Sequence, residues 1–113
     1  MKSRFTKKLG LTFSERVVRI ALSIPSGKVS TYGDIARAAG GGPMASQSIT
    51  GILGKAYQNG EKAIPFHRIV YSDGRVWMSP EYEKKRLKLY QKEGIEIDKK
   101  GRIKHFSDIR LTF

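Results

Sequence analysis

The sequence predicts a mainly α-helical domain with short strands, of the winged-helix-like helix-turn-helix type. Three observations support this class: the chain has only 113 residues, apolar residues recur at helical spacing, and a glycine-rich turn joins two short helical segments. Two helices joined in this way are typical of a helix-turn-helix. With 39% hydrophobic residues the chain can bury one modest core, so we expect a single domain.

An apolar stripe predicts the first helix from residue 13 to residue 24. Ser14 is expected to cap its N-terminus, and Glu15 stands where the helix dipole favours a negative charge. A Pro-Ser-Gly stretch at residues 25–27 ends the helix. The stripe consists of Phe13, Val17, Ile20, Ala21 and Ile24.

The next two helices form the predicted helix-turn-helix. Thr31 starts the second helix with a capping box completed by Asp34, and three glycines at residues 40–42 end it. Pro43 suits the first turn of a third helix that runs to about Tyr57. The expected inner face of the third helix is Met44, Ile49, Ile52 and Leu53.

The third helix also carries an unusual number of small or hydroxylated residues. They include Ala45, Ser46, Ser48 and Gly51. Such residues allow either close approach to a narrow groove or tight packing against another helix. The sequence alone favours neither interpretation.

An extended segment and a last helix follow. Residues 64–71 are apolar enough for a buried extended segment, and Ser-Asp-Gly at residues 72–74 predicts a turn. Ser79 is expected to cap the last helix, with Pro80 at its first position and Glu93-Gly94 at its end. The residues expected to point inward from this helix are Tyr82, Leu87 and Tyr90.

The two ends of the chain are expected to lie outside the main domain. Residues 1–12 form a basic extension, residues 13–95 the domain itself, and residues 96–113 a C-terminal tail. Isoleucines alternate on either side of residues 98–101, which indicates a hairpin in this tail.

The chain carries a large and evenly spread positive charge. Lysine and arginine number 22 against 10 acidic residues, which gives a formal net charge of +12 and a pI of about 10.2. The excess is the same in residues 1–12, 13–78 and 79–113. Such a field attracts polyanions, nucleic acid first and anionic membranes second. Solubility alone is the other explanation of the charge.

The residue types that the sequence lacks exclude several classes of function. The chain has no cysteine, so disulfides, zinc–thiolate sites and thiol nucleophiles are excluded, and two histidines are too few for a histidine-rich metal site. No stretch approaches the roughly 18 apolar residues of a membrane span, and no apolar signal core follows the basic N-terminus. We therefore expect a cytosolic domain with no membrane partner, metal or cofactor.

Four blocks in order carry a resemblance to a known family. Residues 24–36 resemble the helix-turn-helix opening of the O6-alkylguanine-DNA alkyltransferases, and residues 64–70, Ile-Pro-Phe-His-Arg-Ile-Val, resemble their active-site segment. Ser-Asp-Gly at residues 72–74 and Glu93-Gly94 follow in the expected order. The resemblance covers residues 13–95 and implies the fold of that family's C-terminal domain.

Phe66 stands where the resemblance places the alkyl-accepting cysteine. Alkyl transfer needs a thiolate, and a phenyl ring cannot replace it. The sequence therefore resembles the alkyltransferase-like proteins, which usually have tryptophan at this position. This implies a monomeric, non-catalytic protein that binds O6-alkylguanine in double-stranded DNA, flips the base into a pocket and flags it for nucleotide excision repair proteins. The expected location is cytoplasmic, at the nucleoid in a prokaryote or in the nucleus in a eukaryote.

The resemblance also assigns roles at the DNA surface and in the base pocket. Tyr32 is similar to the tyrosine that presses on the phosphate beside the flipped nucleotide. Gln47 aligns with the arginine finger that fills the vacated stack, but it is shorter and uncharged, so its insertion should be weaker. Trp77 either stacks on a flipped base or packs in the core. The remaining DNA-contact residues are Thr31, Ala45, Ser46, Ser48 and Gly51, and Pro65, Phe66 and Val70 complete the pocket with Tyr32 and Trp77.

Four further residues are expected to act structurally. His67 and Glu93 resemble the pair that activates the thiol in the enzymes, and without a thiol they are expected to lock the local geometry. Arg68 is expected to fix neighbouring loops. Asn59 lies near the family's asparagine hinge, although its spacing to Phe66 differs.

Two other functions remain as alternatives. A general or regulatory helix-turn-helix protein could bind DNA without discriminating the lesion, as Gln47 and Phe66 would favour. A glycosylase or hydrolase would need an acid such as Asp34, Asp73 or Glu93, but no two carboxylates have a useful spacing.

Overall fold

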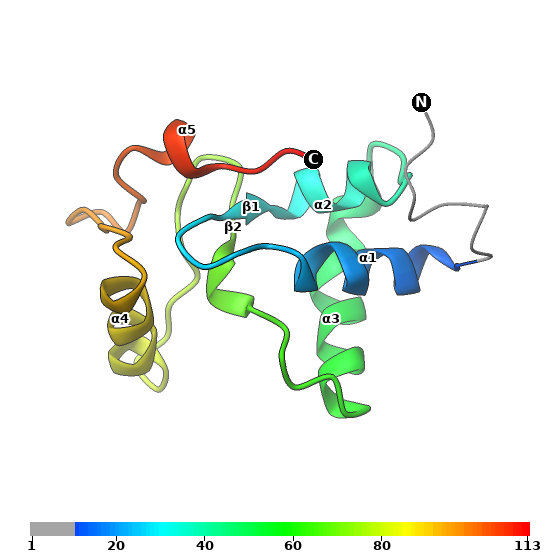
Figure 1. Ribbon diagram of the computed structural model, residues 1–113, viewed down its shortest axis with the longest axis horizontal. Helices are drawn as coiled ribbons and strands as arrows, with labels where there is room; N and C mark the ends of the chain where they lie inside the picture. The colour runs from blue at the N-terminus through cyan, green and yellow to red at the C-terminus, as the bar shows by residue number, and fades with distance from the viewer. Residues whose placement is uncertain (1–10) are drawn as a thin grey trace.

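The computed structural model describes residues 11–113 (Figure 1). The basic residues of the predicted extension, Lys2, Arg4, Lys7 and Lys8, lie outside the described residues. The observed architecture is mainly helical with two short strands, which confirms the predicted class. The elements are α1 (Phe13–Leu22), β1 (Ser30–Thr31), α2 (Tyr32–Ala38), the 3-10 turn η2 (Ala45–Ser48), α3 (Ile49–Gln58), the 3-10 turn η3 (Phe66–Arg68), β2 (Ile69–Val70), α4 (Glu83–Lys92) and α5 (Phe106–Ile109).

Two hydrophobic cores lie on either side of the short sheet. β1 and β2 are parallel, and Ser30 pairs with Ile69 and Thr31 with Val70. The first core joins α1, α2 and α3 to Ile69, whereas Val70 belongs to the second core with Tyr90 of α4. Neighbouring strand residues face opposite sides, so β2 contributes to both cores. Figure 1 shows α1, α2 and α3 at one end of the molecule and α4 at the other.

Two capping boxes fix where α1 and α2 begin. The N-cap of α1 is Thr12, not Ser14, because the Thr12 hydroxyl accepts from the Glu15 amide at 3.1 Å and the Glu15 carboxylate accepts from the Thr12 amide at 3.1 Å. Ser14 lies in the first turn instead. The predicted capping box of Thr31 and Asp34 is confirmed, with distances of 3.0 and 3.3 Å.

The connection between α2 and α3 is longer than predicted. Pro43 lies in this connection, and η2 precedes α3, which begins at Ile49. Met44 was wrongly placed on the inner face: it precedes the helix and is 67% exposed. Gly41 is required here because a Cβ at this position would lie 2.5 Å from the Ala45 Cβ and 3.0 Å from the Ala36 carbonyl oxygen.

The last long helix begins later than predicted. Residues 79–82 form a turn in which the Ser79 carbonyl accepts from the amides of Tyr82 and Glu83, so Ser79 does not cap the helix. Tyr82 and Leu87, predicted to point inward, are 45% and 44% exposed, and Tyr90 is buried as predicted.

The C-terminal segment 96–113 packs onto both cores. Ile97 and Ile103 form an antiparallel bridge around the turn at residues 98–101, as the hairpin pattern predicts. Further along, the amide of Val29 donates to the Ile109 carbonyl at 3.0 Å, and the amide of Leu111 donates to the Val29 carbonyl at 2.7 Å. These bonds hold the segment beside β1.

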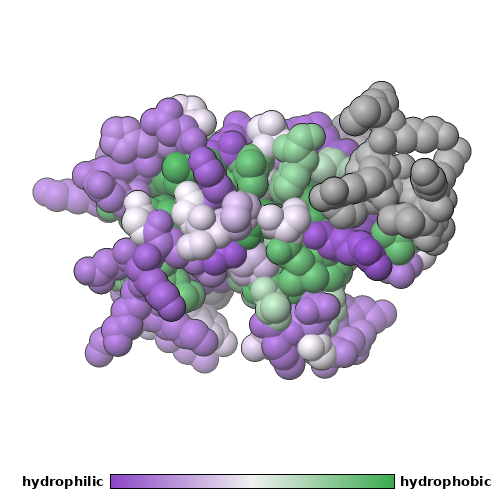
Figure 2. Space-filling view, viewed as in Figure 1, coloured by the Kyte–Doolittle hydropathy of each residue, from purple (hydrophilic) through white to green (hydrophobic). Residues whose placement is uncertain are grey.

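Charged and polar side chains cover most of the molecular surface seen in Figure 2, especially around α4. Hydrophobic side chains are exposed on the same face where α1 crosses α3. No helix among residues 11–113 is long and apolar enough to cross a membrane.

Candidate nucleic-acid interface

A cavity of about 650 Å³ lies beside the first turn of α2 and the start of α3. This volume is within the range of small-molecule binding pockets. Four aromatic side chains from different parts of the chain converge on it, namely Tyr32, Phe66, Tyr71 and Trp77. The rest of the lining comprises Gly33, Ser46, Gln47, Thr50, Ser72 and Arg86. Aromatic walls with a few polar groups suit a planar, partly apolar ligand.

Tyr32 is placed by the capping box that starts α2. Its ring lies 5.7 Å from that of Tyr71, between centroids, at an interplanar angle of 45°. Burial raises the pKa of the Tyr32 hydroxyl, and the nearby Tyr71 adds to this, while Arg86 and Thr50 oppose it. The hydroxyl therefore stays protonated at neutral pH and can donate a hydrogen bond.

Phe66 presents a hydrocarbon ring at the position where the resemblance expects a thiol. The 3-10 turn η3 is closed by the Arg68 amide, which donates to the Pro65 carbonyl at 2.9 Å. The half-buried Phe66 ring packs edge-on against Tyr57, with centroids 5.7 Å apart. The chain has no cysteine, so no thiol is present here.

Trp77 forms part of the cavity wall and not of the core. It is 38% exposed, and its ring lies 5.9 Å from that of Tyr82. The Arg86 guanidinium lies 5.1 Å from the centre of the Trp77 ring. Of the two predicted roles for Trp77, the structure leaves its ring available for stacking.

A buried ionic network supports η3 from behind. The Glu93 carboxylate lies 2.8 Å from His67 Nε2 and accepts from Arg68 Nη2 at 2.6 Å. Arg68 Nη1 also donates to the Ile24 carbonyl at 2.9 Å, and the Gly27 amide donates to Glu93 at 3.2 Å. Burial raises the pKa of Glu93, but the hydrogen bonds from Arg68, His67 and Gly27 outweigh it and lower this pKa to about 2. The network ties η3 and the end of α4 to the loop after α1.

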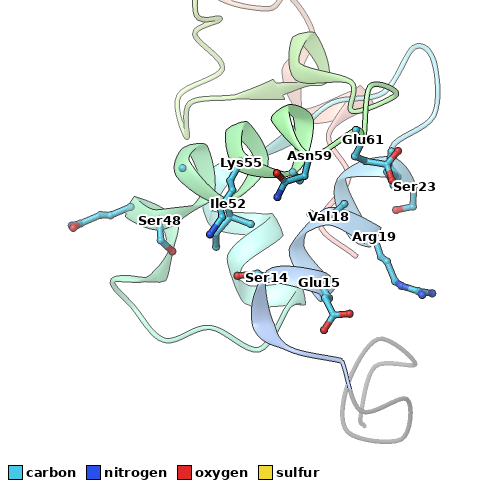
Figure 3. A pocket seen from close by; sticks show the side chains of 15 residues that line it. Ser14, Glu15, Val18, Arg19, Ser23, Ser48, Ile52, Lys55, Asn59 and Glu61 are labelled. Carbon is cyan, nitrogen blue, oxygen red and sulfur yellow. The ribbon is translucent and has the colours of Figure 1, made fainter.

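A larger and more open groove of about 1450 Å³ lies between α1 and α3. Figure 3 shows side chains of the two helices that face each other across it, such as Val18 and Ile52. Gln47 lines both this groove and the aromatic cavity, so it stands on the ridge between them. Among residues 11–113, none that lines the groove is aromatic, which makes it a poorer match for a base.

Residues 12–95 match the family described as the DNA-binding domain of 6-O-methylguanine DNA methyltransferase. The chain belongs to this family. The resemblance inferred from the sequence is thereby confirmed.

Several members of the family and its relatives are similar to this chain. A DNA base-flipping protein of Escherichia coli is 33% identical over 93 residues, which cover 81% of this chain and 69% of the relative. A protein of the same name from Vibrio parahaemolyticus is 33% identical over 94 residues, covering 80% and 88%. The structure of S. pombe Atl1 in complex with damaged DNA containing O6-carboxymethylguanine matches with a TM-score of 0.64 and 27% identity, covering 88% of this chain and 94% of Atl1.

Within this family domain, the predicted interface residues fall on two surfaces. Tyr32, Ser46 and Gln47 line the aromatic cavity, while Ser48 and Gly51 line the open groove together with Gln47. Asn59, predicted to act structurally, also lines the groove. The Thr31 hydroxyl is buried and caps α2, and Ala45 packs against the first core.

Two predicted pocket residues do not line the aromatic cavity. Val70 is fully buried in the second core, because it follows Ile69 on a strand and faces the opposite side. Pro65 is buried beneath η3. Only Phe66, Trp77 and Tyr32 of the predicted pocket set remain in its wall.

The sequence argument did not assign Gly33, Thr50, Tyr71 or Arg86 to this lining. Arg86 stands four residues after Tyr82 and four before Tyr90, so helical spacing could have placed it on the face of α4 that includes Tyr90. Thr50 and Tyr71 carry no comparable periodic signal in the sequence.

Proposed function

We propose that this protein recognises O6-alkylguanine in duplex DNA, takes the modified base out of the stack into the aromatic cavity, and does no chemistry on it. The observation that carries the proposal is the cavity itself: four aromatic rings converge beside a helix-turn-helix, with Phe66 in place of a nucleophile. The names of the base-flipping relatives and the damaged-DNA complex of Atl1 support the same function.

Physical chemistry favours a modified base as the ligand. Extracting a base from the stack costs a few kcal/mol, and a base that pairs poorly costs less to extract. Tyr32 lies in the cavity wall at the start of α2, and Gln47 lines both the cavity and the open groove. These two positions suit a residue that presses on the backbone and one that enters the vacated stack. The net charge of +12 supplies the sequence-independent attraction to phosphates.

We also propose that the bound complex flags the lesion for nucleotide excision repair. The chain has no cysteine to accept the alkyl group, so removal of the lesion requires another set of proteins. Incision of a lesion-bearing duplex by reconstituted excision repair should increase when this protein is added.

The deciding experiment compares binding to two duplexes of identical sequence, one with guanine and one with O6-methylguanine at the same position. We expect at least about a tenfold preference for the modified duplex, and a steep loss of affinity for both as salt is raised. Mass spectrometry should find neither a released base nor an alkylated protein. A genuine alkyltransferase acting on the same duplex should be inhibited by this protein.

A general or regulatory DNA-binding protein is the second candidate. Gln47 favours it, because an exposed, uncharged side chain at the finger position fills a vacated stack less well than arginine. Equal affinity for the two duplexes, with no protection from the alkyltransferase, would establish this candidate and rule out lesion recognition.

A further inference from the structure

A second cavity of about 340 Å³ adjoins the aromatic cavity on the far side of Phe66. The two cavities share Phe66, Trp77 and Arg86 in their linings, so these side chains form the partition between them. The other residues around the second cavity are Tyr57, Lys62, Ile64, His67, Tyr82, Lys85 and Leu89. A substituent on a bound base that extends past these three side chains would enter the second cavity, whose lining differs from that of the aromatic cavity.

The lining of the second cavity carries positive charge without a neutralising carboxylate. Lys62, Lys85 and Arg86 contribute cations, and no aspartate or glutamate belongs to the lining. Among residues 11–113, no carboxylate lies within 4.0 Å of these three cations in an ion pair. The Glu93 carboxylate does not line this cavity: it contacts His67, which does, and it is already paired with Arg68.

Aromatic faces hold two of these cations in place. The Lys62 ammonium lies 4.0 Å from the centre of the Tyr57 ring, and the Arg86 guanidinium 5.1 Å from that of Trp77. Arg86 Nη1 is also 3.5 Å from the Phe66 carbonyl oxygen, at the limit of a hydrogen bond. Both cations keep donors free for a stronger acceptor such as a carboxylate.

We infer that the second cavity receives the far end of the O6 substituent and favours a substituent that ends in a carboxylate. This inference rests on the proposed function, because it needs the modified guanine in the aromatic cavity. The apolar stem of the substituent would pass Phe66 and Trp77, and its carboxylate would meet Lys62, Lys85 and Arg86. The Atl1 complex contains a guanine with such a group, O6-carboxymethylguanine.

The test compares two duplexes that differ in charge but hardly in shape. One contains O6-carboxymethylguanine, and the other contains the neutral amide O6-carbamoylmethylguanine. We expect the carboxylate duplex to bind about fivefold more tightly, since partly exposed cations contribute modestly. In the double variant Lys62→Gln, Lys85→Gln, which keeps Arg86, this ratio should fall to about two or less.

The control variant is Lys84→Gln, which removes an exposed lysine of α4 outside both cavity linings. It should leave the ratio at about five, even if it weakens binding to every duplex. Equal affinity for the acid and the amide in the wild-type protein overturns the inference. An acid-to-amide affinity ratio that stays at about five in the double variant also overturns the inference. If that variant weakens binding to all duplexes equally, the two lysines contact DNA phosphates instead of the substituent.

Duplexes with guanine and O6-methylguanine separate this inference from the proposed function. If O6-methylguanine is preferred over guanine while acid and amide bind alike, only the assignment of the second cavity fails. If no modified duplex is preferred over guanine, lesion recognition fails and the inference falls with it.

Discussion

The two halves of the molecule each bury one carboxylate, and each carboxylate is bound partly by the other half. Asp34 belongs to residues 11–60, which carry α1 to α3, and accepts from Arg110 Nε at 2.8 Å and Nη2 at 2.9 Å. Glu93 belongs to residues 61–113 and accepts from the Gly27 amide of the first half. The two sites therefore join the helix-turn-helix to the half that carries η3 and Trp77.

The two sites differ in how well their cationic partners are shielded from water. The side chains of Asp34 and Glu93 are 0% and 6% exposed, so both carboxylates are shielded. Arg37 and Arg110 at the Asp34 site are 66% and 32% exposed. His67 and Arg68 at the Glu93 site are only 11% and 20% exposed. When its carboxylate partner is removed, an exposed guanidinium can be hydrated by water, whereas a buried one stays without a counter-charge. Loss of the carboxylate at the Glu93 site should therefore lower the free energy of unfolding more than loss of the carboxylate at the Asp34 site.

Glu93→Gln tests this comparison with the largest expected effect. The substitution leaves the buried Arg68 without a negative charge, and we expect the free energy of unfolding to fall by about 3 kcal/mol. Urea unfolding followed by circular dichroism measures it. The control is Asp73→Asn, which breaks an exposed pair with Arg75 and should cost far less than Glu93→Gln. Similar losses in the two variants would contradict a buried, tightly coupled network.

The same site predicts how stability depends on pH. Folding lowers the pKa of Glu93 from 4.5 to about 2, so its contribution is complete above pH 4.5 and is lost as the pH falls towards 2. A shift of this size corresponds to about 3 kcal/mol. The pKa of Asp34 is lowered as well: burial raises it, but the bonds from Arg110 and Thr31 outweigh burial, and the loss has the same sign. Glu93→Gln should therefore flatten, but not abolish, the fall in stability between pH 4.5 and 2.

Arg110→Ala probes the other junction and should have a smaller effect, about 2 kcal/mol. Its guanidinium is partly exposed, but its loss leaves the fully buried Asp34 with only Arg37 and the Thr31 cap. Hydrogen exchange at the start of α2 should speed up, because Asp34 belongs to the capping box. The matched control Arg102→Ala removes an exposed arginine that pairs with Asp73. If exchange in α2 does not change, the C-terminal segment does not stabilise the helix-turn-helix.

The two junctions also show what could be predicted from the sequence. The cluster of His67, Arg68 and Glu93 was expected because all three lie within the blocks that resemble the family. The partner of Asp34 could not be predicted, since Arg110 lies 76 residues away in the chain and outside residues 12–95. A contact of that range leaves no periodic pattern in a single sequence.

The site shows the same limit at shorter range. Phe66 and Tyr32 line the aromatic cavity, and each belongs to a motif that the sequence shows. Val70 does not line this cavity, because it follows Ile69 on a two-residue strand and is buried in the second core. Thr12 was readable as the cap of α1, because Glu15 stands three residues later and completes a capping box, whereas Val17 stands three residues after Ser14.

Gly41→Ala tests the rigidity of the first half alone, with an expected loss of about 1.5 kcal/mol. The added methyl group would overlap the Ala45 Cβ at 2.5 Å and the Phe13 ring at 2.9 Å, and this overpacking strains the turn before α3. Gly42→Ala is the matched control, since its added Cβ meets nothing within 4 Å. Thermal unfolding of both variants measures the difference. Equal melting temperatures would mean that the turn adapts, and the first half would be softer than the structure indicates.

Tyr32→Ala addresses the contact between the halves at the cavity and should have the smallest free-energy effect. Tyr32 begins α2 in the first half, and its ring meets Tyr71 of the second half at the cavity wall. We expect affinity for an O6-methylguanine duplex to fall about tenfold, equivalent to about 1.4 kcal/mol, and affinity for the unmodified duplex to fall much less. Tyr32→Phe keeps the ring and removes the hydroxyl, so it separates wall packing from hydrogen bonding to the DNA backbone. If Tyr32→Ala lowers the affinity for both duplexes equally, Tyr32 contributes to general DNA binding. Recognition of the lesion would then not depend on the contact between Tyr32 and Tyr71 in the cavity wall.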